Sequence, residues 1–281
     1  MLSISYCAST IIKDMVDILL TNDDGYQSIG FISLLKELSK EFSVLAITSP
    51  DGKSWTGKAI TAKREMDLKK VKIDGFDILV LNGTPADCVQ VGIYNILKKL
   101  PRMVVSGIND GPNIGRGRIL SSGTVGAAME ASIIGIKAIA SSFCLFSDVY
   151  RKPVKKINFI DSKNCPILKN AAEITFKLVK TLIKKDFSKD VDLFSINIPF
   201  NATINSDFEI TKLFKDTDWK LFHKKNNKFI HHTPFLKIKD LQSGTDLKAL
   251  KEGKISITPI SLELASEKSF KEFKQIIKKE W

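Results

Sequence analysis

Short apolar segments alternate with amphipathic segments along the first half of the chain. The apolar segments have the length of β-strands, and each ends in polar residues; they are residues 16–20, 42–48, 78–81, 103–105 and 138–142. Apolar residues at helical spacing predict helices at residues 28–40 and 122–134, and Thr84 with Pro85 marks the start of another helix. Strands that alternate with helices predict a Rossmann-like, three-layer α/β/α fold with a mostly parallel central sheet.

The pattern changes after residue 148. Residues 164–185 predict a long helix, and residues 192–198 predict a further strand of the sheet. Three strand-like segments then follow without helices between them, which predicts a C-terminal β-hairpin arm; they are residues 208–214, 219–222 and 229–238. The remaining elements are a short helix, a strand and a terminal helix, expected at residues 245–250, 255–260 and 266–279.

These patterns divide the chain into four parts. Residues 1–14 form an N-terminal extension, either disordered or belonging to a start that is assigned too early, because Met15 stands directly before the first strand. Residues 15–200 form the α/β core, and residues 201–244 form the hairpin arm. Residues 245–281 supply a strand and a helix that we expect to return to the core.

Charge and composition narrow the class of protein. The 281 residues include 43 Lys and Arg against 31 Asp and Glu, and the net charge of +12 favours anionic partners. The basic residues are not interleaved with aromatic residues in one stripe, which argues against a nucleic-acid surface. Neither a secretory leader nor an apolar run of roughly 18 residues is present, so we expect a cytoplasmic protein that does not enter a membrane.

The cysteines and histidines lack the spacing of metal or redox motifs. The absence of a C-x-x-C pair predicts free thiols in a reducing compartment for the four cysteines, Cys7, Cys88, Cys144 and Cys165. The histidines lie in the expected arm, where we assign them surface or packing roles; they are His223, His231 and His232.

Two adjacent carboxylates, Asp23 and Asp24, directly follow the first predicted strand. Like charges side by side repel unless a cation or hydrogen bonds offset them. Oxygen ligands of this kind suit a hard cation such as Mg²⁺ or Mn²⁺. The sequence Asn-Asp-Asp-Gly at residues 22–25 is also good turn chemistry, so a turn that merely caps the next helix is equally consistent with the pair alone.

Residues 106–121, after the strand at residues 103–105, are expected to form a glycine-rich loop. Six of the 16 glycines lie between Gly107 and Gly126, a density that lets the backbone approach a ligand closely. Residues 122–126 open a predicted helix, whose free N–H groups and dipole favour a phosphate. The segment is neither a Walker A loop nor a dinucleotide fingerprint.

Ser54, in the loop after the second predicted strand, brings a hydroxyl to the same edge of the sheet. In open parallel sheets, ligands bind beyond the carboxyl ends of the strands, where this loop and the two preceding motifs all lie. The chain has no Gly-x-Ser-x-Gly sequence, which argues against a serine hydrolase.

Five motifs in this order resemble the SurE family (survival protein E) of metal-dependent nucleotidases. They are Leu-Leu-Thr-Asn-Asp-Asp-Gly at 19–25, Ser-Pro-Asp at 49–51 through Ser54 to Gly57, Gly-Thr-Pro-Ala-Asp-Cys-Val at 83–89, Ser-Gly-Ile-Asn with Gly-Pro-Asn at 106–113, and Ser-Gly-Thr-Val at 122–125. Weaker similarity continues at residues 197–199, 245–246 and 256–259, so the resemblance covers roughly residues 16–262.

The resemblance implies a site and an activity. It implies one divalent cation per subunit, Mg²⁺ or Mn²⁺, bound by Asp23, Asp24, Ser54 and Asn109. It implies phosphate contacts from Asn113, Ser122, Gly123 and Thr124, and a catalytic role for the two aspartates. The implied reaction is hydrolysis of nucleoside 5′- and 3′-monophosphates to nucleoside and phosphate. Family members form homodimers or homotetramers, so we expect the arm at residues 201–244 to serve oligomerisation.

Some positions depart from the family pattern and leave alternatives open. The loop at residues 50–54 is one residue shorter than in many members, Lys58 stands where a histidine is common, and Arg118 and Ser121 replace commoner residues. These changes border the substrate side. A non-catalytic nucleotide- or phosphate-binding module, and a broad-specificity acid phosphatase or exopolyphosphatase, therefore remain alternatives to a nucleotidase. Whether an aspartate acts as base or nucleophile also stays open.

Overall fold

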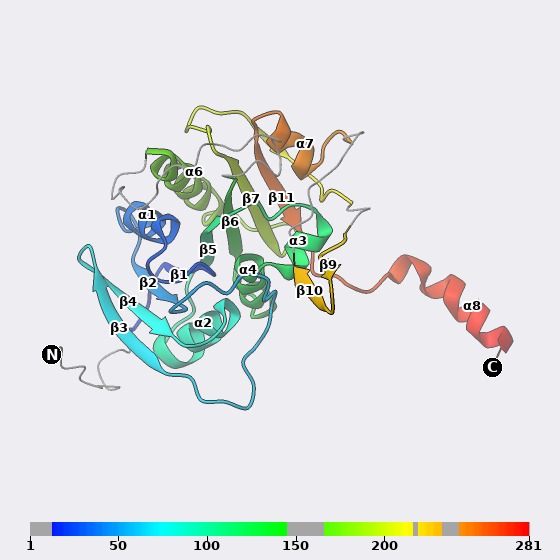
Figure 1. Ribbon diagram of the computed structural model, residues 1–281, viewed down its shortest axis with the longest axis horizontal. Coiled ribbons are helices and arrows are strands. Elements are labelled where there is room, and N and C mark those ends of the chain that lie inside the picture. Colours follow the sequence, from blue (N-terminus) through cyan, green and yellow to red (C-terminus); the bar gives the residue numbers. More distant parts are fainter. Residues whose placement is uncertain (1–12, 145–165, 216–218, 232–241, 281) are drawn as a thin grey trace.

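A single mixed sheet forms the centre of the molecule (Figure 1). The computed structural model describes residues 13–144, 166–215, 219–231 and 242–280. Within these ranges, nine strands lie side by side in the order β3-β4-β2-β1-β5-β6-β7-β11-β8. Their bounds are β1 (Ile18–Thr21), β2 (Val44–Thr48), β3 (Leu68–Ile73), β4 (Phe76–Leu81), β5 (Met103–Asp110), β6 (Ala138–Cys144), β7 (Leu193–Pro199), β8 (Phe208–Ile210) and β11 (Ile255–Ile260).

The six central strands, from β4 to β7, all run parallel. Outside them, β3 is antiparallel to β4, β11 is antiparallel to β7, and β8 is parallel to β11. The mostly parallel sheet predicted from the alternating pattern is confirmed. Because β2, β1 and β5 are neighbours, the loops after these three strands meet at one edge of the sheet.

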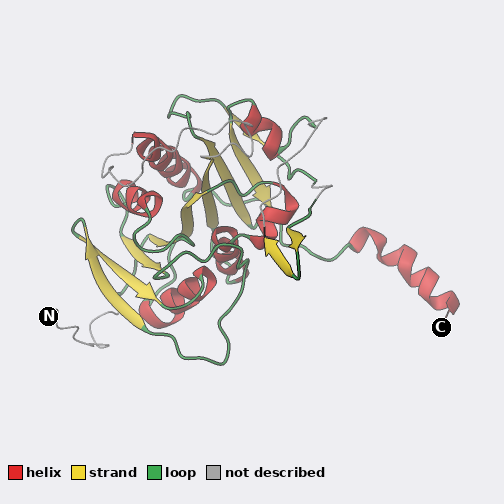
Figure 2. Cartoon of the chain, viewed as in Figure 1, coloured by secondary structure: helices red, strands yellow, loops and turns green. Residues whose placement is uncertain are grey.

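Helices cover both faces of the sheet, which completes the expected three layers (Figure 2). Those near the sheet are α1 (Ile29–Leu38), α2 (Pro85–Val91), α3 (Gly115–Ser121), α4 (Gly123–Ile133), α6 (Pro166–Leu182) and α7 (Asp246–Lys251). A π-helical turn (Gly92–Ile96) extends α2. On one face α1 packs beside α6, and on the other α2 packs beside α4.

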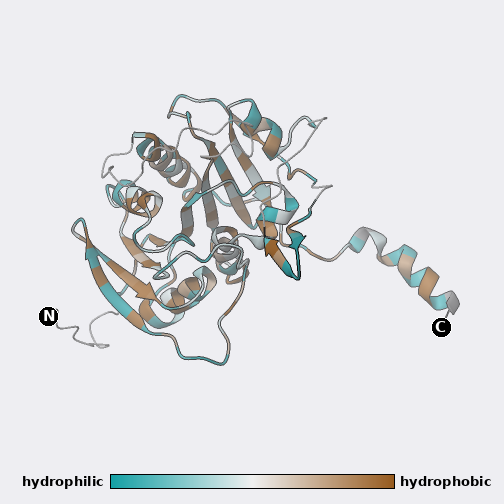
Figure 3. Ribbon diagram, in the orientation of Figure 1, coloured by the Kyte–Doolittle hydropathy of each residue, from teal (hydrophilic) through white to brown (hydrophobic). Residues whose placement is uncertain are grey.

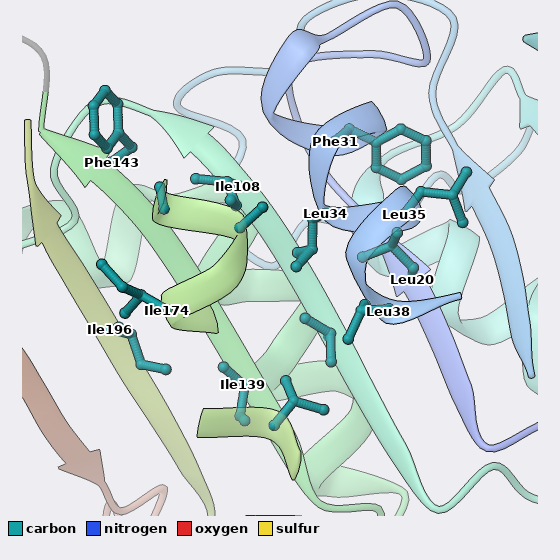
Figure 4. Close-up of a cluster of buried hydrophobic side chains, with 14 of the residues drawn as sticks. Leu20, Phe31, Leu34, Leu35, Leu38, Ile108, Ile139, Phe143, Ile174 and Ile196 are labelled. Carbon is teal, nitrogen blue, oxygen red and sulfur yellow. The ribbon is translucent and has the colours of Figure 1, made fainter. Parts of the chain in front are cut away.

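Alternate residues of each strand supply the two cores. Ile18 and Leu20 of β1 join the cluster under α1 and α6, whereas Leu19 between them joins the cluster under α2 and α4. Figure 4 shows part of the first cluster, where Phe31 and Leu34 of α1 are fully buried. A strand buried on both faces is apolar at every position, which explains the unbroken apolar segments of the sequence.

Side-chain hydroxyls cap the starts of three helices. The Ser28 hydroxyl accepts a hydrogen bond from the Phe31 amide of α1, and the Ser122 hydroxyl accepts one from the Val125 amide of α4. Thr84 and Asp87 form a reciprocal capping box at α2, with Pro85 in the first turn. The predicted cap at Thr84 is therefore confirmed.

Two segments of the first half differ from the expectation. Residues 106–121 were expected to form a loop, but β5 continues to Asp110 and residues 115–121 form α3. The strand β3, which we did not predict, pairs with β4 through a turn at Asp74 and Gly75, both with positive φ. Its lysines face solvent at the sheet edge, so the strand lacks the apolar density of the buried ones.

The C-terminal third also differs. The segment expected as the first strand of the arm supplies β8, which pairs with β11 in the main sheet because β11 otherwise presents an open edge. The arm is a two-stranded sheet of β9 (Phe222–Lys225) and β10 (Lys228–His231). Residues 232–238 of the expected third strand lie outside the described residues.

The terminal helix does not return to the core. A single 3₁₀ turn (Glu267–Ser269) leads into α8 (Phe270–Glu280), which extends away from the sheet (Figure 1). Apolar and polar positions alternate along α8 (Figure 3), and Phe270 and Phe273 are both exposed. Amphipathic spacing predicts a helix but does not specify the surface that it covers, which is why the expected contact with the core was wrong.

The remaining expectations concern the termini, the thiols and the membrane. Residues 1–12 lie outside the described residues, whereas the Lys13 amide donates to the Ile96 carbonyl oxygen at 3.0 Å. Cys88 and Cys144 are thiols, as predicted. Both are buried, and burial raises the pKa of the Cys88 thiol; Cys7 and Cys165 lie outside the described part. Within the described ranges, every helix is too short or too polar to cross a bilayer.

Candidate functional site

A pocket of about 200 Å³ lies at the carboxyl end of the central strands. Its lining includes five of the eight predicted site residues, Asp23, Ser54, Asn109, Asn113 and Ser122. Asp24 lines an adjoining pocket that shares Asn109 and Asp110 with the first. The parallel sheet therefore brings together side chains from the loops after β1 and β2, from the end of β5 and the loop after it, and from the start of α4.

The Asp23 side chain, from the loop after β1, packs against the N-terminus of α4. It is 3% exposed, and the Thr124 hydroxyl donates a hydrogen bond to its carboxylate. A Cβ atom on Gly123 would lie 2.9 Å from the Cβ atom of Asp23, so the helix start approaches this closely only because residue 123 is glycine. The Thr124 hydroxyl thus positions Asp23, and the phosphate contact expected of Thr124 stays a prediction.

The loop that carries Asp24 is held from two sides. The Asp110 amide donates to Oδ2 of Asp24 at 2.9 Å, and the Asn22 side chain donates to the Gly25 carbonyl oxygen at 3.1 Å. The Lys53 amide donates to the carbonyl oxygen of Asp23 at 2.6 Å, which joins the loops after β1 and β2. The Asn-Asp-Asp-Gly sequence thus makes a turn and presents carboxylates to the pocket at the same time.

The carboxylates of Asp23 and Asp24 are largely buried from solvent. Burial raises the pKa of Asp23 to about 7, and the charge of Asp24 adds to this effect, although hydrogen bonds from Thr124 and the backbone oppose it. Burial also raises the pKa of Asp24, partly offset by the Asp110 amide. Burial and the charge of Asp24 raise the pKa of Asp110 to about 6. Clustered, desolvated carboxylates of this kind fit a cation, whose charge relieves their repulsion.

Two neutral oxygen donors complete the candidate ligand set. The Asn109 Nδ2 atom donates a hydrogen bond to the Gly111 carbonyl oxygen at 2.6 Å. The Oδ1 atom of Asn109 therefore remains available as a metal ligand. Ser54 is exposed in the loop after β2. In the described part of the chain, no three His, Cys, Asp or Glu side chains group as metal ligands, so a cation here depends on these two oxygens as well as on the two aspartates.

The loop that carries Ser54 is anchored to α4. The Gly57 amide donates to the Ser121 carbonyl oxygen at 2.9 Å, and a Cβ atom on Gly126 would lie 2.3 Å from the Gly57 carbonyl oxygen. Lys58 forms an ion pair with the buried Glu130 of α4 at 2.5 Å. The lysine that replaces the common histidine therefore ties the loop to the helix and does not line the pocket.

Buried amides fix the side of the pocket where phosphate contacts are expected. The Asn113 side chain donates to the Ser142 hydroxyl at 2.8 Å, and its backbone exchanges hydrogen bonds of 2.8 and 3.0 Å with the Asn197 side chain. Ser122 uses its hydroxyl as the cap of α4. Asn197 and Ser142 were not predicted as site residues, although the weak motif at residues 197–199 pointed to Asn197.

A further buried carboxylate, Asp246, fixes the start of α3. Asp246 is fully buried and accepts hydrogen bonds from the amides of Gly115, Phe214 and Leu247 at 2.7, 2.9 and 2.7 Å. It thereby joins α7 to the first residue of α3, the helix that brings Arg118 to the pocket. The weak motif at residues 245–246 was the signal for this role.

The comparisons with known proteins agree with the motifs. A family model, SurE: Survival protein SurE, matches residues 18–220. The 5′-nucleotidase SurE of Methanococcus vannielii is 34% identical over 275 residues, covering 95% of this chain and 99% of the relative. The 5′-nucleotidase SurE of Methanocaldococcus jannaschii is 35% identical, covering 92% of this chain and 97% of the relative.

A solved structure gives the same result at the level of the fold. The crystal structure of the SurE protein from Aquifex aeolicus has a TM-score of 0.73 and 30% sequence identity, and the match covers 92% of this chain and 99% of that chain. Both the family model and the relatives span most of the chain, including every residue of the candidate site. The chain therefore belongs to the survival protein SurE family.

Proposed function

We propose that this protein is a divalent-metal-dependent 5′-nucleotidase that hydrolyses nucleoside 5′- and 3′-monophosphates to nucleoside and phosphate. One observation carries the proposal: two desolvated carboxylates, Asp23 and Asp24, face pockets that also contain neutral oxygen donors and the start of a helix. The relatives named 5′-nucleotidase support the choice of substrate class.

The residues that would hold the cation are Asp23, Asp24, Ser54 and Asn109. When bound, a Mg²⁺ or Mn²⁺ ion supplies Lewis acidity toward the phosphoryl oxygens of the substrate. The oxygen-only donor set suits such an ion and suits zinc or copper less well.

The chain itself orients the reacting groups. The Thr124 hydroxyl fixes the carboxylate of Asp23, and the Asp110 amide fixes that of Asp24, so neither has to reorganise during the reaction. The N-terminus of α4 and the Arg118 side chain bring positive charge to the pocket. The net charge of +12 draws anionic substrates toward the protein.

The decisive experiment measures phosphate release. The full chain is incubated with 5′- and 3′-monophosphates of each nucleoside, with Mn²⁺ or Mg²⁺ and then with excess chelator. We expect phosphate release with metal and its loss after chelation, restored when metal is added back. Binding of the nucleotides without phosphate release would instead support the non-catalytic module, and release that persists in chelator would contradict metal dependence.

A further inference from the structure

Aromatic side chains from distant parts of the chain meet beside the pocket. Trp55 follows Ser54 in the loop after β2, and Trp219 precedes β9, yet their ring centroids lie 6.1 Å apart. The His231 ring of β10 meets Trp55 edge-on at 4.7 Å. Figure 1 shows β9 and β10 beside α3, the helix whose residues reach the same place. We call Trp55, Trp219, His231 and Arg118 the aromatic rim.

Trp55 has an unusual backbone and a functional position. Its φ of 64° lies in the left-handed region, which a bulky side chain rarely adopts. Strained residues of this kind concentrate at functional sites, because the surrounding structure must hold them in place. Trp55 also lines the pocket with Asp23 and Ser54, and its side chain remains 39% exposed.

The neighbours of Trp55 hold a second ring in a defined place. Trp219 lies directly against the backbone of α3, where a Cβ atom on Gly117 would be 2.5 Å from the ring. The Arg118 guanidinium carbon lies 5.8 Å from the centroid of the same ring, and Arg118 lines the pocket. The rim therefore combines aromatic faces with a positive charge at the entrance to the metal and phosphate residues.

Packing of the hairpin alone explains the rim less well. Aromatic residues that only anchor a hairpin bury their faces, whereas Trp55 is 39% and Phe222 is 53% exposed. A hairpin anchor also has no need of a ring held next to a candidate metal ligand in a strained conformation. An exposed aromatic face with an adjacent guanidinium is, by contrast, the kind of surface on which nucleobases stack.

We propose that Trp55, supported by Trp219 and Arg118, holds the nucleobase of the substrate and makes the enzyme select phosphomonoesters whose alcohol carries a planar aromatic ring. This inference rests on the proposed nucleotidase function. Asn113 and Ser122, the residues expected to contact phosphate, line the same pocket as Trp55 and Arg118, so the organic part of a bound ester lies within reach of the rim. Every nucleobase has a π-face that can stack on the rim. The rim therefore favours phosphomonoesters that carry a base over those without one, with little preference among the different bases.

The test compares two substrates that differ by the base. We measure kcat/KM for adenosine 5′-monophosphate and for ribose 5-phosphate with Mn²⁺, using the unmodified chain, Trp55→Ala and Trp55→Phe. The ratio compared is kcat/KM for adenosine 5′-monophosphate divided by kcat/KM for ribose 5-phosphate. Loss of stacking in Trp55→Ala lowers this ratio by about 5- to 100-fold, mainly by raising the KM for adenosine 5′-monophosphate. Trp55→Phe, which keeps an aromatic face, restores most of the ratio.

A matched control separates binding from packing of the hairpin. Phe229 of β10 is aromatic and 72% exposed but does not line the pocket, so Phe229→Ala keeps the ratio of the unmodified chain. An unchanged ratio in Trp55→Ala overturns the proposal, and so does an equal fall in Phe229→Ala. Thermal unfolding of each variant establishes that it is folded.

A second measurement needs no variant. Adenosine, which lacks the phosphate, is expected to inhibit phosphate release from ribose 5-phosphate competitively, whereas ribose at the same concentration does not. Equal effects of adenosine and ribose would contradict a base subsite while leaving the phosphatase activity in place. If the unmodified chain releases phosphate from neither substrate, the proposed function fails as well, so the two failures are distinguishable.

Discussion

At the scale of single residues, the site depends on carboxylates that are kept apart from water. Asp23 is buried beside Asp24 and is stabilised by Thr124, whose hydroxyl comes from the start of α4. Removing one negative charge relieves repulsion within the site but also removes a candidate cation ligand. Stability and activity should therefore respond in opposite directions to the same substitution.

Asp23→Asn and Asp24→Asn test this relation. We expect each variant to lower phosphate release by at least about 100-fold, because loss of a ligand exceeds the usual effect of losing a supporting hydrogen bond. Thermal unfolding of the metal-free variants should occur at the same temperature as in the unmodified chain or above it. Asp77→Asn, on the surface of β4, serves as the control. Near-normal turnover of both site variants at saturating metal would refute the assignment.

Thr124→Val tests the positioning of Asp23. Valine has a similar shape but cannot donate to the Asp23 carboxylate, so we expect metal affinity and phosphate release to fall by about 10- to 100-fold. Titration of activity with Mn²⁺, together with calorimetric metal binding, measures both effects. Thr124→Ser retains the hydroxyl and should recover most of the loss. A metal affinity that is the same in Thr124→Val and the unmodified chain would show that the hydrogen bond is incidental.

At the scale of elements, the site depends on how short helices are fixed to the sheet. The helix α3 is held at its first residue by Asp246 of α7, a residue distant in sequence. The same carboxylate receives the Phe214 amide, just before the segment that leads to Trp219 and the hairpin. One buried side chain thus fixes both the start of α3, which carries Arg118, and the backbone at Phe214.

Asp246→Ala leaves three buried amides without their acceptor. Each unsatisfied group costs about 1–3 kcal/mol, so we expect the free energy of unfolding to fall by about 2–4 kcal/mol after partial relaxation. Urea denaturation measures this change. Asp246→Asn keeps an oxygen acceptor and should lose less, whereas equal stability of Asp246→Ala and the unmodified chain would contradict the role of this side chain as a buried cap.

At the scale of the whole molecule, an apolar surface is left open on α8. The exposed apolar residues of α8 lie on a helix that extends from the core, namely Phe270, Phe273, Ile276 and Ile277. Contiguous exposed apolar patches often mark surfaces that associate. This observation supports the homo-oligomer that we expected from the family resemblance.

Light scattering measures the oligomeric state directly. We expect a mass of two or four chains, and a lower mass for the double variant Phe270→Ser, Phe273→Ser, because serine removes both exposed aromatic rings of α8. Lys271→Ser with Lys274→Ser changes the polar positions of the same helix and should keep the mass. A single-chain mass for the unmodified protein would disprove the expectation.

The sequence by itself determined the features that depend on neighbours along the chain. Strand-length apolar segments, helical spacing and the capping residue Thr84 depend on local geometry, so the order of the central elements was predictable. Motif spacing placed Asp23, Ser54 and Asn109 at one edge of the sheet, because the carboxyl ends of parallel strands meet there.

Only the tertiary structure decided the features that depend on distant partners. The hydrogen bond from Thr124 to Asp23 joins residues 101 positions apart, and the contact of Trp55 with Trp219 joins even more distant ones. The pairing of β8 with β11 and the direction of α8 likewise depend on which surface each element meets. Local periodicity indicates that a segment has an apolar face or a polar side chain. The packing of the complete chain decides which other residues that face or side chain contacts.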